Sequence, residues 1–314
     1  MQNINEKALA VTAEVSKAVL GKPEVVLKIM MAILARGHVL VEDIPGVGKT
    51  TMAVAFSKAL SLKYNRMQFT SDVMPADVTG FYMPNRATGE FDFKPGAVFC
   101  NLFLADEINR TSSKTQSALL EAMEEGAVTV DSVTRKLPDP FIVLATQNPS
   151  GSAGTQLLPE SQLDRFMIRL SMGYPTVGEE TEILKAKSSK KAAPQVEPIM
   201  TAQDLIEIRS AAEDVFVSDE IYDYIARLSG ATRSDRRLEL GVSTRGSLAA
   251  AAMAKCAAMF KGRNFVIPED VTFVYTDVCA HRIIPARVKG KLPSDIEVRK
   301  ILCDICRGVT PPKI

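Results

Sequence analysis

The residues best suited to chemistry in this chain lie in the stretch HVLVEDIPGVGKTT, from His38 to Thr51. A short apolar run leads into a turn that contains glycines, and the turn leads into Lys49. Gly46 and Gly48 would let the backbone point its N–H groups at a polyphosphate, and Lys49 would add a positive charge beside the terminal phosphates. The sequence therefore predicts a phosphate-binding loop.

The residues that follow the lysine support this interpretation. Thr50 offers a hydroxyl to Mg²⁺. A helix predicted over residues 49–60 would direct its N-terminus, where the helix dipole favours negative charge, at the phosphates. Asp43 departs from the GxxxxGK[ST] pattern, because it occupies the place of the first glycine. Aspartate tolerates left-handed backbone angles, so we expect Asp43 to leave binding intact despite its charge.

Two acids and one amide follow further apolar runs. Asp106 and Glu107 come directly after residues 102–105, which have the pattern of a strand buried on both faces. Asp106 would hold the Mg²⁺ shell opposite Thr50, and Glu107 could orient and deprotonate an attacking water. Asn148 ends the next such run and could bond the γ-phosphate or that water, although turn chemistry before a proline is the alternative.

These residues require a sheet that brings the ends of several strands together. Strands are predicted at residues 38–41, 64–69, 102–105, 141–146 and 167–170. Their alternation with helices over residues 38–171 predicts a mostly parallel sheet with helices on both faces, whose ligands bind at the carboxyl ends of the strands. Two hairpins, over residues 80–93 and 127–137, are expected as insertions.

The regions on either side of the sheet differ from it in character. Residues 3–20 and 23–37 predict two helices, and residues 185–198, rich in lysine, serine and proline, predict a linker. Beyond the linker, capping and proline signals predict helices only. We therefore expect an α/β domain over residues 1–190 and a smaller all-α domain over residues 191–314.

The composition is that of an ordinary globular protein. Its 314 residues suit two domains, and the hydrophobic and charged fractions of 46% and 24% indicate neither disorder nor a membrane protein. The net charge of +1 provides no broad basic surface, which disfavours nucleic acid as a partner. Neither a leader pattern nor an apolar run of membrane length is evident, so a cytoplasmic protein without a membrane segment is expected.

The cysteines and histidines suggest no further chemistry. The chain has five cysteines, an odd number, which disfavours a disulfide framework. Cys303 and Cys306 form a CxxC in a predicted helix, but no second pair or nearby histidine completes a zinc site. His38 and His281 are too few for a histidine-rich metal site or a histidine-centred triad.

Five motifs in order make the chain similar to AAA+ ATPases of the MoxR family: LVEDIPGVGKT, FLADEINR, LATQNP, LLPESQLDRFM and GVSTRG. The resemblance covers nearly the whole chain. It implies a P-loop AAA+ parallel sheet flanked by helices, followed by a small all-α lid domain. It also implies a hexameric ring of identical subunits with ATP at the subunit interfaces. In relatives, the inserts that correspond to the two hairpins face the pore or the client.

The resemblance also assigns roles to residues. The Walker A motif falls on Gly46, Val47, Gly48, Lys49, Thr50 and Thr51. The Walker B motif falls on Asp106 and Glu107, and sensor 1 on Asn148. ATP and Mg²⁺ are the implied cofactors, and Thr50 and Asp106 are the expected metal-holding residues.

Further assignments concern residues outside these motifs. Arg165 resembles the arginine finger, which in relatives faces the γ-phosphate of the neighbouring subunit, and Arg245 resembles sensor 2. Val19 and Leu20 resemble the stretch that backs the adenine ring. For Arg110, just after Walker B, the residues favour an ordinary surface salt bridge over a contact with phosphate or with a neighbouring subunit.

The implied function is that of an ATP-hydrolysing, chaperone-like protein that remodels, assembles or activates client complexes. MoxR relatives typically work with a partner that carries a von Willebrand factor A domain, but no residue here identifies that partner. The alternatives are a chelatase-like or nucleic-acid motor subunit and a nucleotide-gated scaffold with negligible turnover. The near-neutral charge disfavours the motor, and intact Glu107 and Asn148 disfavour the scaffold.

Overall fold

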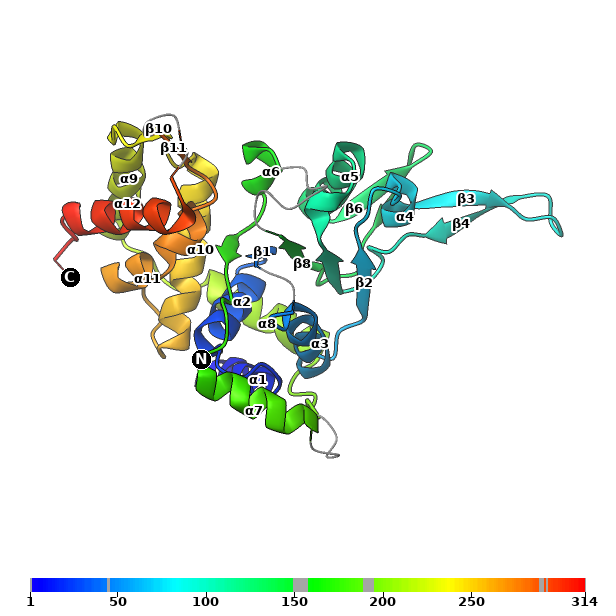
Figure 1. The fold of residues 1–314 in the computed structure, drawn as a ribbon, viewed down its shortest axis with the longest axis horizontal. Helices are drawn as coiled ribbons and strands as arrows, with labels where there is room; N and C mark the ends of the chain where they lie inside the picture. Colours follow the sequence, from blue (N-terminus) through cyan, green and yellow to red (C-terminus); the bar gives the residue numbers. More distant parts are fainter. Residues whose placement is uncertain are drawn as a thin grey trace.

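The computed structural model describes residues 2–43, 46–148, 158–188, 195–287, 291 and 293–313 (Figure 1). Its elements are α1 Gln2–Ala18, α2 Pro23–Leu34, β1 Val39–Glu42, α3 Lys49–Ala59, β2 Tyr64–Gln68, α4 Pro75–Thr79, β3 Gly80–Pro84, β4 Phe91–Pro95, β5 Leu102–Asp106, the 3₁₀ turn η1 Ile108–Arg110, α5 Ser113–Glu125, β6 Ala127–Val130, β7 Val133–Lys136, β8 Ile142–Gln147, α6 Glu160–Leu163, β9 Ile168–Leu170, α7 Val177–Ser188, α8 Ala202–Glu213, α9 Asp219–Ser234, β10 Leu238–Leu240, α10 Thr244–Phe260, α11 Pro268–Cys279, β11 Ile284–Pro285 and α12 Asp295–Gly308.

The central sheet of the described residues has five parallel strands in the order β2-β5-β8-β1-β9. This confirms the predicted parallel sheet. Strands β5 and β8 are buried along their whole length, as their continuous apolar runs predict. Because β5, β8 and β1 are neighbours, the residues that follow them emerge side by side at one edge of the sheet.

Helices cover both faces of the sheet. Alternate side chains point to opposite faces, so Val39 and Val41 of β1 belong to one core cluster, and Leu40 between them belongs to another. The first cluster contains the apolar faces of α1, α2 and α3, and the second contains that of α5. The predicted layers are therefore confirmed.

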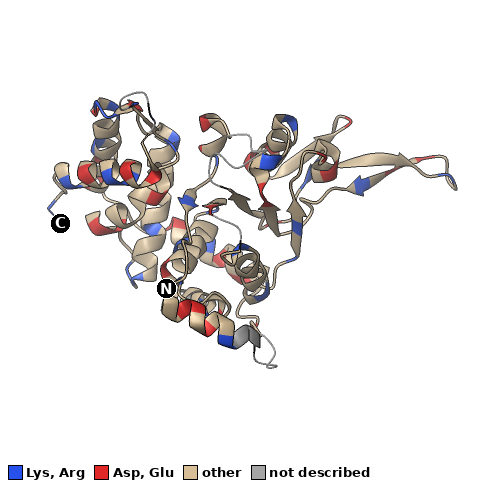
Figure 2. Cartoon of the chain, in the orientation of Figure 1, with Lys and Arg blue, Asp and Glu red and all other residues tan. Residues whose placement is uncertain are grey.

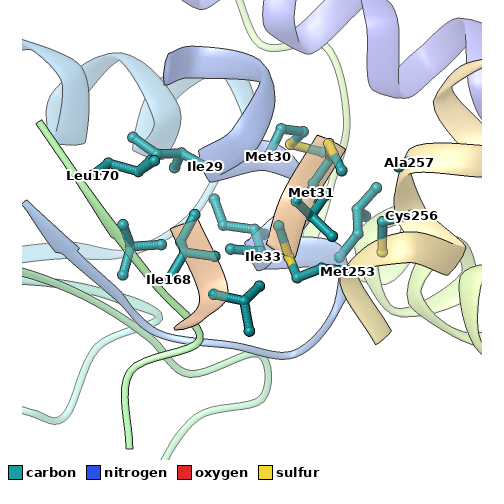
Figure 3. Close-up of a cluster of buried hydrophobic side chains, with 14 of the residues drawn as sticks. Ile29, Met30, Met31, Ile33, Ile168, Leu170, Met253, Cys256 and Ala257 are labelled. Atoms are coloured by element: carbon teal, nitrogen blue, oxygen red, sulfur yellow. The ribbon is translucent and has the colours of Figure 1, made fainter. Parts of the chain in front are cut away.

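The first core cluster continues from the sheet into the C-terminal helices. In Figure 3, Met30, Met31 and Ile33 of α2 lie in one cluster with Ile168 of β9 and Met253 of α10. Helix α2 is therefore shared by the sheet domain and the lid. The predicted boundary at residue 190 lies outside the described residues and stays a prediction.

The chain differs from the sequence-based expectation in two places. Residues 185–188 of the predicted linker belong to α7, while residues 189–194 lie outside the described part. The lid is also not purely helical where it is described, since β10 and β11 form a short antiparallel pair. Strands of three and two residues are too short to give a period-2 pattern in the sequence.

Both predicted hairpins are present, as β3–β4 and β6–β7. The β3–β4 hairpin extends away from the body of the molecule (Figure 1). Arg135 of β7 joins the two hairpins, because its guanidinium lies 4.1 Å from the ring centroid of Phe93 and its Nη2 donates to the hydroxyl of Tyr82 at 2.7 Å. The two insertions therefore form one connected unit.

Two features of the described residues bear on compartment and redox chemistry. Within them, no helix combines the length and apolarity needed to span a membrane. All five cysteine side chains there are free thiols, and Cys303 and Cys306 lie in α12 as predicted. The cytoplasmic location stays a prediction.

Candidate nucleotide-binding and hydrolysis site

Residues 46–48, the described part of the turn between β1 and α3, have the backbone of a phosphate-binding loop. Gly46 and Gly48 have φ angles of 89° and 97°, which glycine adopts without strain. A Cβ atom on Gly46 would meet no atom within 4 Å, so the space beside the loop is open. Helix α3 begins at Lys49 and directs its free N–H groups at this space. The turn therefore suits a bound phosphate.

Lys49 lies over the loop, surrounded by acidic groups. Its Nζ donates to the backbone oxygen of Asp43 at 2.8 Å, and its side chain is largely buried. Burial lowers the pKa of Lys49, while the charges of Asp106, Asp43 and Glu107 oppose that shift. The ammonium group therefore lies between the loop and the carboxylates of the adjacent strands, where a terminal phosphate would need it.

Replacing Lys49 with alanine is expected to abolish nucleotide binding. The variant removes the flexible positive charge of the loop and leaves the carboxylates of Asp106 and Glu107 to repel the phosphates. Titration calorimetry with ATP measures the effect, and Lys58→Ala at the other end of α3 is the matched control. An unchanged affinity in a folded Lys49→Ala protein would mean that the loop is only a structural turn.

Asp43, the departure from the glycine pattern, has a structural role. Its Oδ2 accepts hydrogen bonds from Ser171 Oγ at 3.1 Å, from the backbone N–H of Met172 at 2.6 Å and from that of Gly173 at 2.8 Å. The carboxylate thereby ties the start of the loop to the segment after β9. These bonds account for an aspartate at this position, and its compatibility with ATP stays a prediction.

Asp106 is fixed at the end of β5 by a residue of each neighbouring strand. Its Oδ1 accepts from Thr146 Oγ1 at 2.6 Å, and its Oδ2 accepts from Arg66 Nη2 at 2.7 Å. The same Thr146 hydroxyl accepts the backbone N–H of Glu107 at 2.9 Å. Sequence reasoning missed Thr146, whose signal is a hydroxyl at the end of an otherwise apolar strand.

Glu107 adopts an unusual backbone conformation and has two charged or polar partners. Its φ and ψ of 57° and 48° are left-handed, a conformation that costs a non-glycine residue on the order of 1–3 kcal/mol and recurs at functional sites. Oε1 accepts from Asn148 Nδ2 at 3.1 Å, and Oε2 accepts from Arg110 Nη1 at 2.9 Å. The salt bridge expected of Arg110 is therefore present, and its partner is the candidate base.

These contacts determine the charge of the Glu107 carboxyl. Burial alone would raise its pKa, but hydrogen bonds from Arg110, Asn148 and Gln68 outweigh burial and hold the pKa below the ordinary value. The group is therefore a carboxylate at neutral pH. A carboxylate oxygen at this edge of the sheet can accept a hydrogen bond, and then a proton, from water.

Asn148 is positioned by a second asparagine that sequence reasoning missed. Asn109 Nδ2 donates to the backbone oxygen of Asn148 at 3.1 Å, and the N–H of Asn148 donates to Asn109 Oδ1 at 3.4 Å. Gln116 Nε2 holds the 3₁₀ turn that carries Asn109 by donating to Ile108 O at 3.1 Å. Among the described residues, the buried Oδ1 of Asn148 has no hydrogen-bond partner, so it can still accept from a ligand or a water.

The residues expected to hold Mg²⁺ offer suitable atoms. Thr50 lies half-buried in the first turn of α3 and supplies a hydroxyl, and Asp106 supplies a carboxylate, both being oxygen ligands that Mg²⁺ prefers. Of the remaining loop residues, Val47 is half-buried and Thr51 is exposed.

The two residues expected to back the adenine ring have different surroundings. Val19 is 5% exposed and belongs to the main core cluster, whereas Leu20 is 37% exposed. Both follow the end of α1 directly. Their role toward a base stays a prediction.

Arg165 and Arg245 lie together, but apart from the phosphate loop. Each contacts the carboxylate of Glu124, Arg165 through Nη2 at 3.1 Å and Arg245 through Nη2 at 2.6 Å. Arg245 Nη1 also lies 3.8 Å from Asp164 Oδ2. These side chains line a cleft of about 350 Å³, which His38 also lines.

This cleft lies at the opposite edge of the sheet from the phosphate loop. Its lining includes His38, which precedes β1, and Met167, which precedes β9. The loop follows β1, whose four residues span roughly 13 Å at ~3.3 Å per residue. The structure therefore brings Lys49 together with the ends of β5 and β8, and it leaves Arg165 and Arg245 at the amino edge.

The site combines a glycine turn, a lysine at a helix N-terminus, and acids and an asparagine at the ends of adjacent parallel strands. This combination defines a P-loop nucleotide-binding protein. The sequence model of the ATPase family associated with various cellular activities (AAA) matches residues 38–168. The model described as the AAA lid domain matches residues 230–301. The class is thus an AAA ATPase domain with its lid.

Relatives identify the family within this class. The uncharacterized protein YeaC of Bacillus subtilis is 43% identical over 92% of this chain and 91% of its own length. The chaperone MoxR1 of Mycobacterium tuberculosis is 38% identical over 86% of this chain and 74% of its own length. A crystal structure from Cytophaga hutchinsonii, described as that of a candidate ATPase, superposes with a TM-score of 0.90 at 36% identity and covers 99% of this chain and 97% of its own. The chain belongs to the MoxR family of AAA ATPases.

Proposed function

We propose that this protein hydrolyses ATP and uses the reaction to remodel, assemble or activate client protein complexes. Transfer of a phosphoryl group to water needs a phosphate cradle, a metal, a base and positive charge at the transition state. The observation that carries the proposal is the meeting of Lys49, Asp106, Glu107 and Asn148 at one edge of the sheet. These residues can meet the first three needs within one subunit.

Each residue has a distinct task in this proposal. Residues 46–51 hold the phosphates of ATP through backbone N–H groups and the Lys49 ammonium. Thr50 and Asp106 hold Mg²⁺, which neutralises phosphate charge when bound. Glu107 orients the attacking water and accepts its proton, and Asn148 holds both the Glu107 carboxylate and the γ-phosphate or water.

The fourth need, positive charge at the γ-phosphate, is assigned to a neighbouring subunit. Arg165 and Arg245 lie at the amino edge of the sheet, with 30% and 50% of their side chains exposed. This position supports a role in trans, in which both arginines approach ATP held by the next subunit of a ring. A hexamer is the ring that the family resemblance implies.

Contact with a client is assigned to the hairpin inserts. Three apolar side chains of the β3–β4 hairpin, Phe81, Met83 and Phe91, are exposed, and the hairpin extends from the body (Figure 1). Exposed apolar groups of this kind suit contact with another protein. The name of MoxR1 describes that relative as a chaperone, which supports the same activity here, with a von Willebrand factor A domain protein as the proposed partner.

The client can be captured with the protein held in its ATP-bound form. Glu107→Gln, tagged and incubated with ATP and Mg²⁺, should retain client and partner, whereas Lys49→Ala should not. Mass spectrometry of the bound proteins identifies them. Retention of tetrapyrrole-pathway proteins, with stimulation of turnover by tetrapyrroles, would favour the chelatase alternative. Negligible phosphate release by the wild-type protein would favour the scaffold.

DNA and RNA are expected to leave ATP turnover unchanged at physiological salt. The net charge is +1, and lysine and arginine alternate with aspartate and glutamate along the same helices (Figure 2). A surface without an excess of positive charge releases few counterions on contact with a phosphate backbone. Steady-state phosphate release, with and without duplex or single-stranded nucleic acid at two salt concentrations, measures this. Stimulation that fades with salt would favour the nucleic-acid motor.

A further inference from the structure

The segment that carries Arg165 is bound by a residue of the lid. Arg282 follows α11, and its side chain is 2% exposed. It reaches the stretch from Asp164 to Met167, which leads from α6 into β9. A buried arginine of the lid therefore contacts the backbone on both sides of Arg165, whose side chain is 30% exposed.

Every N–H group of the Arg282 guanidinium has an acceptor. Nε donates to Asp164 Oδ1 at 2.7 Å. Nη2 donates to the backbone oxygens of Asp164 at 3.1 Å and Phe166 at 2.6 Å. Nη1 donates to Met167 O at 3.0 Å and to Val278 O. Because burial penalises any carbonyl or N–H group left without a partner, Arg282 and this stretch should move as one body.

His281 adds a bond to the same stretch. Its Nε2 lies 2.9 Å from Phe166 O, which can only accept, so Nε2 carries the proton. Burial, and to a lesser extent repulsion from Arg282, lowers the pKa of His281 well below its ordinary value. The ring is therefore neutral at neutral pH. Two consecutive lid residues thus bind the carbonyl next to Arg165.

The same guanidinium is connected to Arg245. Asp164 accepts from Arg282 through Oδ1, and its Oδ2 lies 3.8 Å from Arg245 Nη1. Gly246 makes room for this arrangement in α10, since a Cβ atom there would lie 3.0 Å from Arg282 Cδ and 2.6 Å from Val242 Cγ1. One buried side chain is therefore linked to Arg165 through the neighbouring backbone and to Arg245 through Asp164.

From these contacts we propose that Arg282 is a positioning residue, which sets Arg165 and Arg245 according to the position of the lid and so couples the lid of one subunit to hydrolysis in the next. The proposal rests on the proposed function, in which both arginines act in trans. Arg282 itself touches no nucleotide. Its effect must appear in the turnover of the neighbouring site and spare the ATP affinity of its own site.

Arg282→Lys is the first test, with Arg299→Lys as the matched control. Lysine keeps the charge but has three donors, so it cannot hold the carbonyls on both sides of Arg165. Arg299 also joins the lid to β9, through Nη2 to Arg169 O at 3.1 Å, but it does not contact the stretch around Arg165. Arg282→Lys should keep the Kd for ATP and form rings while kcat falls on the order of 10²-fold. Arg299→Lys should keep wild-type turnover.

Mixed rings locate the defect. Lys49→Ala subunits bind no ATP but carry intact Arg165 and Arg282, so adding them to Arg282→Lys subunits should restore turnover. Arg165→Ala subunits, mixed with Lys49→Ala in parallel, test the trans role itself. The positioning role is wrong if Arg165→Ala is rescued but Arg282→Lys is not. It is also wrong if Arg165→Ala is rescued and rings made only of Arg282→Lys subunits already have wild-type turnover. If neither is rescued, the trans role fails and the inference fails with it.

A second variant covers the case in which Arg282→Lys subunits do not fold or assemble. His281→Leu removes one donor to Phe166 O and leaves Arg282 in place. It should lower kcat less than Arg282→Lys, with the Kd for ATP unchanged, and Lys49→Ala subunits should rescue it. Assembled His281→Leu rings with wild-type kcat would overturn the proposal.

Discussion

Rings made only of Arg165→Ala subunits are expected to hydrolyse ATP more slowly than wild-type rings by on the order of 10³–10⁵-fold, the range measured for inserted arginines in GTPase systems. A fixed guanidinium neutralises charge that develops only in the transition state, and an alanine cannot. In the isolated chain Arg165 pairs with Glu124 at the amino edge of the sheet, away from its own Lys49. The proposed trans role therefore predicts that the lost turnover is that of the neighbouring site.

Steady-state phosphate release by wild-type and variant rings measures this effect. Arg86→Ala, which removes an exposed arginine near the turn of the β3–β4 hairpin, is the matched control and should keep basal turnover. Turnover per wild-type subunit should rise with protein concentration as rings form. Dilute monomer that hydrolyses ATP as fast as the ring would contradict the trans assignment.

Glu107→Gln is expected to bind ATP with wild-type affinity and to lower turnover by roughly 10²–10⁴-fold, the usual contribution of a general base. The amide keeps the shape of the side chain and one acceptor oxygen, but it takes no proton from water. Because hydrogen bonds hold the pKa of Glu107 below its ordinary value of 4.5, the wild-type protein should lose this base only below that pH.

Calorimetry and phosphate release together separate binding from chemistry in this variant. Glu121→Gln is the control, since Glu121 is an exposed acid on α5. Wild-type turnover in Glu107→Gln would assign the base to another residue. A loss of ATP affinity equal to the loss of turnover would instead make Glu107 a binding residue.

Much of the phosphate site could be predicted because its signals are local. The glycines, lysine and threonine that predict the loop lie within a few positions of one another. The apolar run that ends in Asp106 and Glu107 is enough to predict the two acids. Thr146 and Asn109 escaped prediction because their roles depend on which atoms meet across strands. Residues 105 and 145 are paired in the sheet, so the hydroxyl of Thr146 can reach Asp106, and no local pattern encodes that register.

The contact of Arg165 and Arg245 with one carboxylate could not be predicted from the sequence either. Arg165 and Arg245 are 80 positions apart, and they meet at Glu124 only because α10 packs beside the sheet domain. The family resemblance named both residues without indicating that they share a carboxylate. Arg282, in a part of the lid where sequence reasoning found only helices, carries no motif that would single it out.

Asp43 anchors the segment that follows the short strand β9. At the carboxyl end of β9, Asp43 of the phosphate loop holds the backbone of Met172 and Gly173, while Arg282 holds the stretch before its amino end. A shift of the loop on loss of nucleotide would therefore pull on the strand that leads back to Arg165. Since this linkage would run from one subunit's own nucleotide to the site of the next, a closed ring built this way would couple neighbouring sites, and the dependence of turnover on ATP concentration would depart from a simple hyperbola.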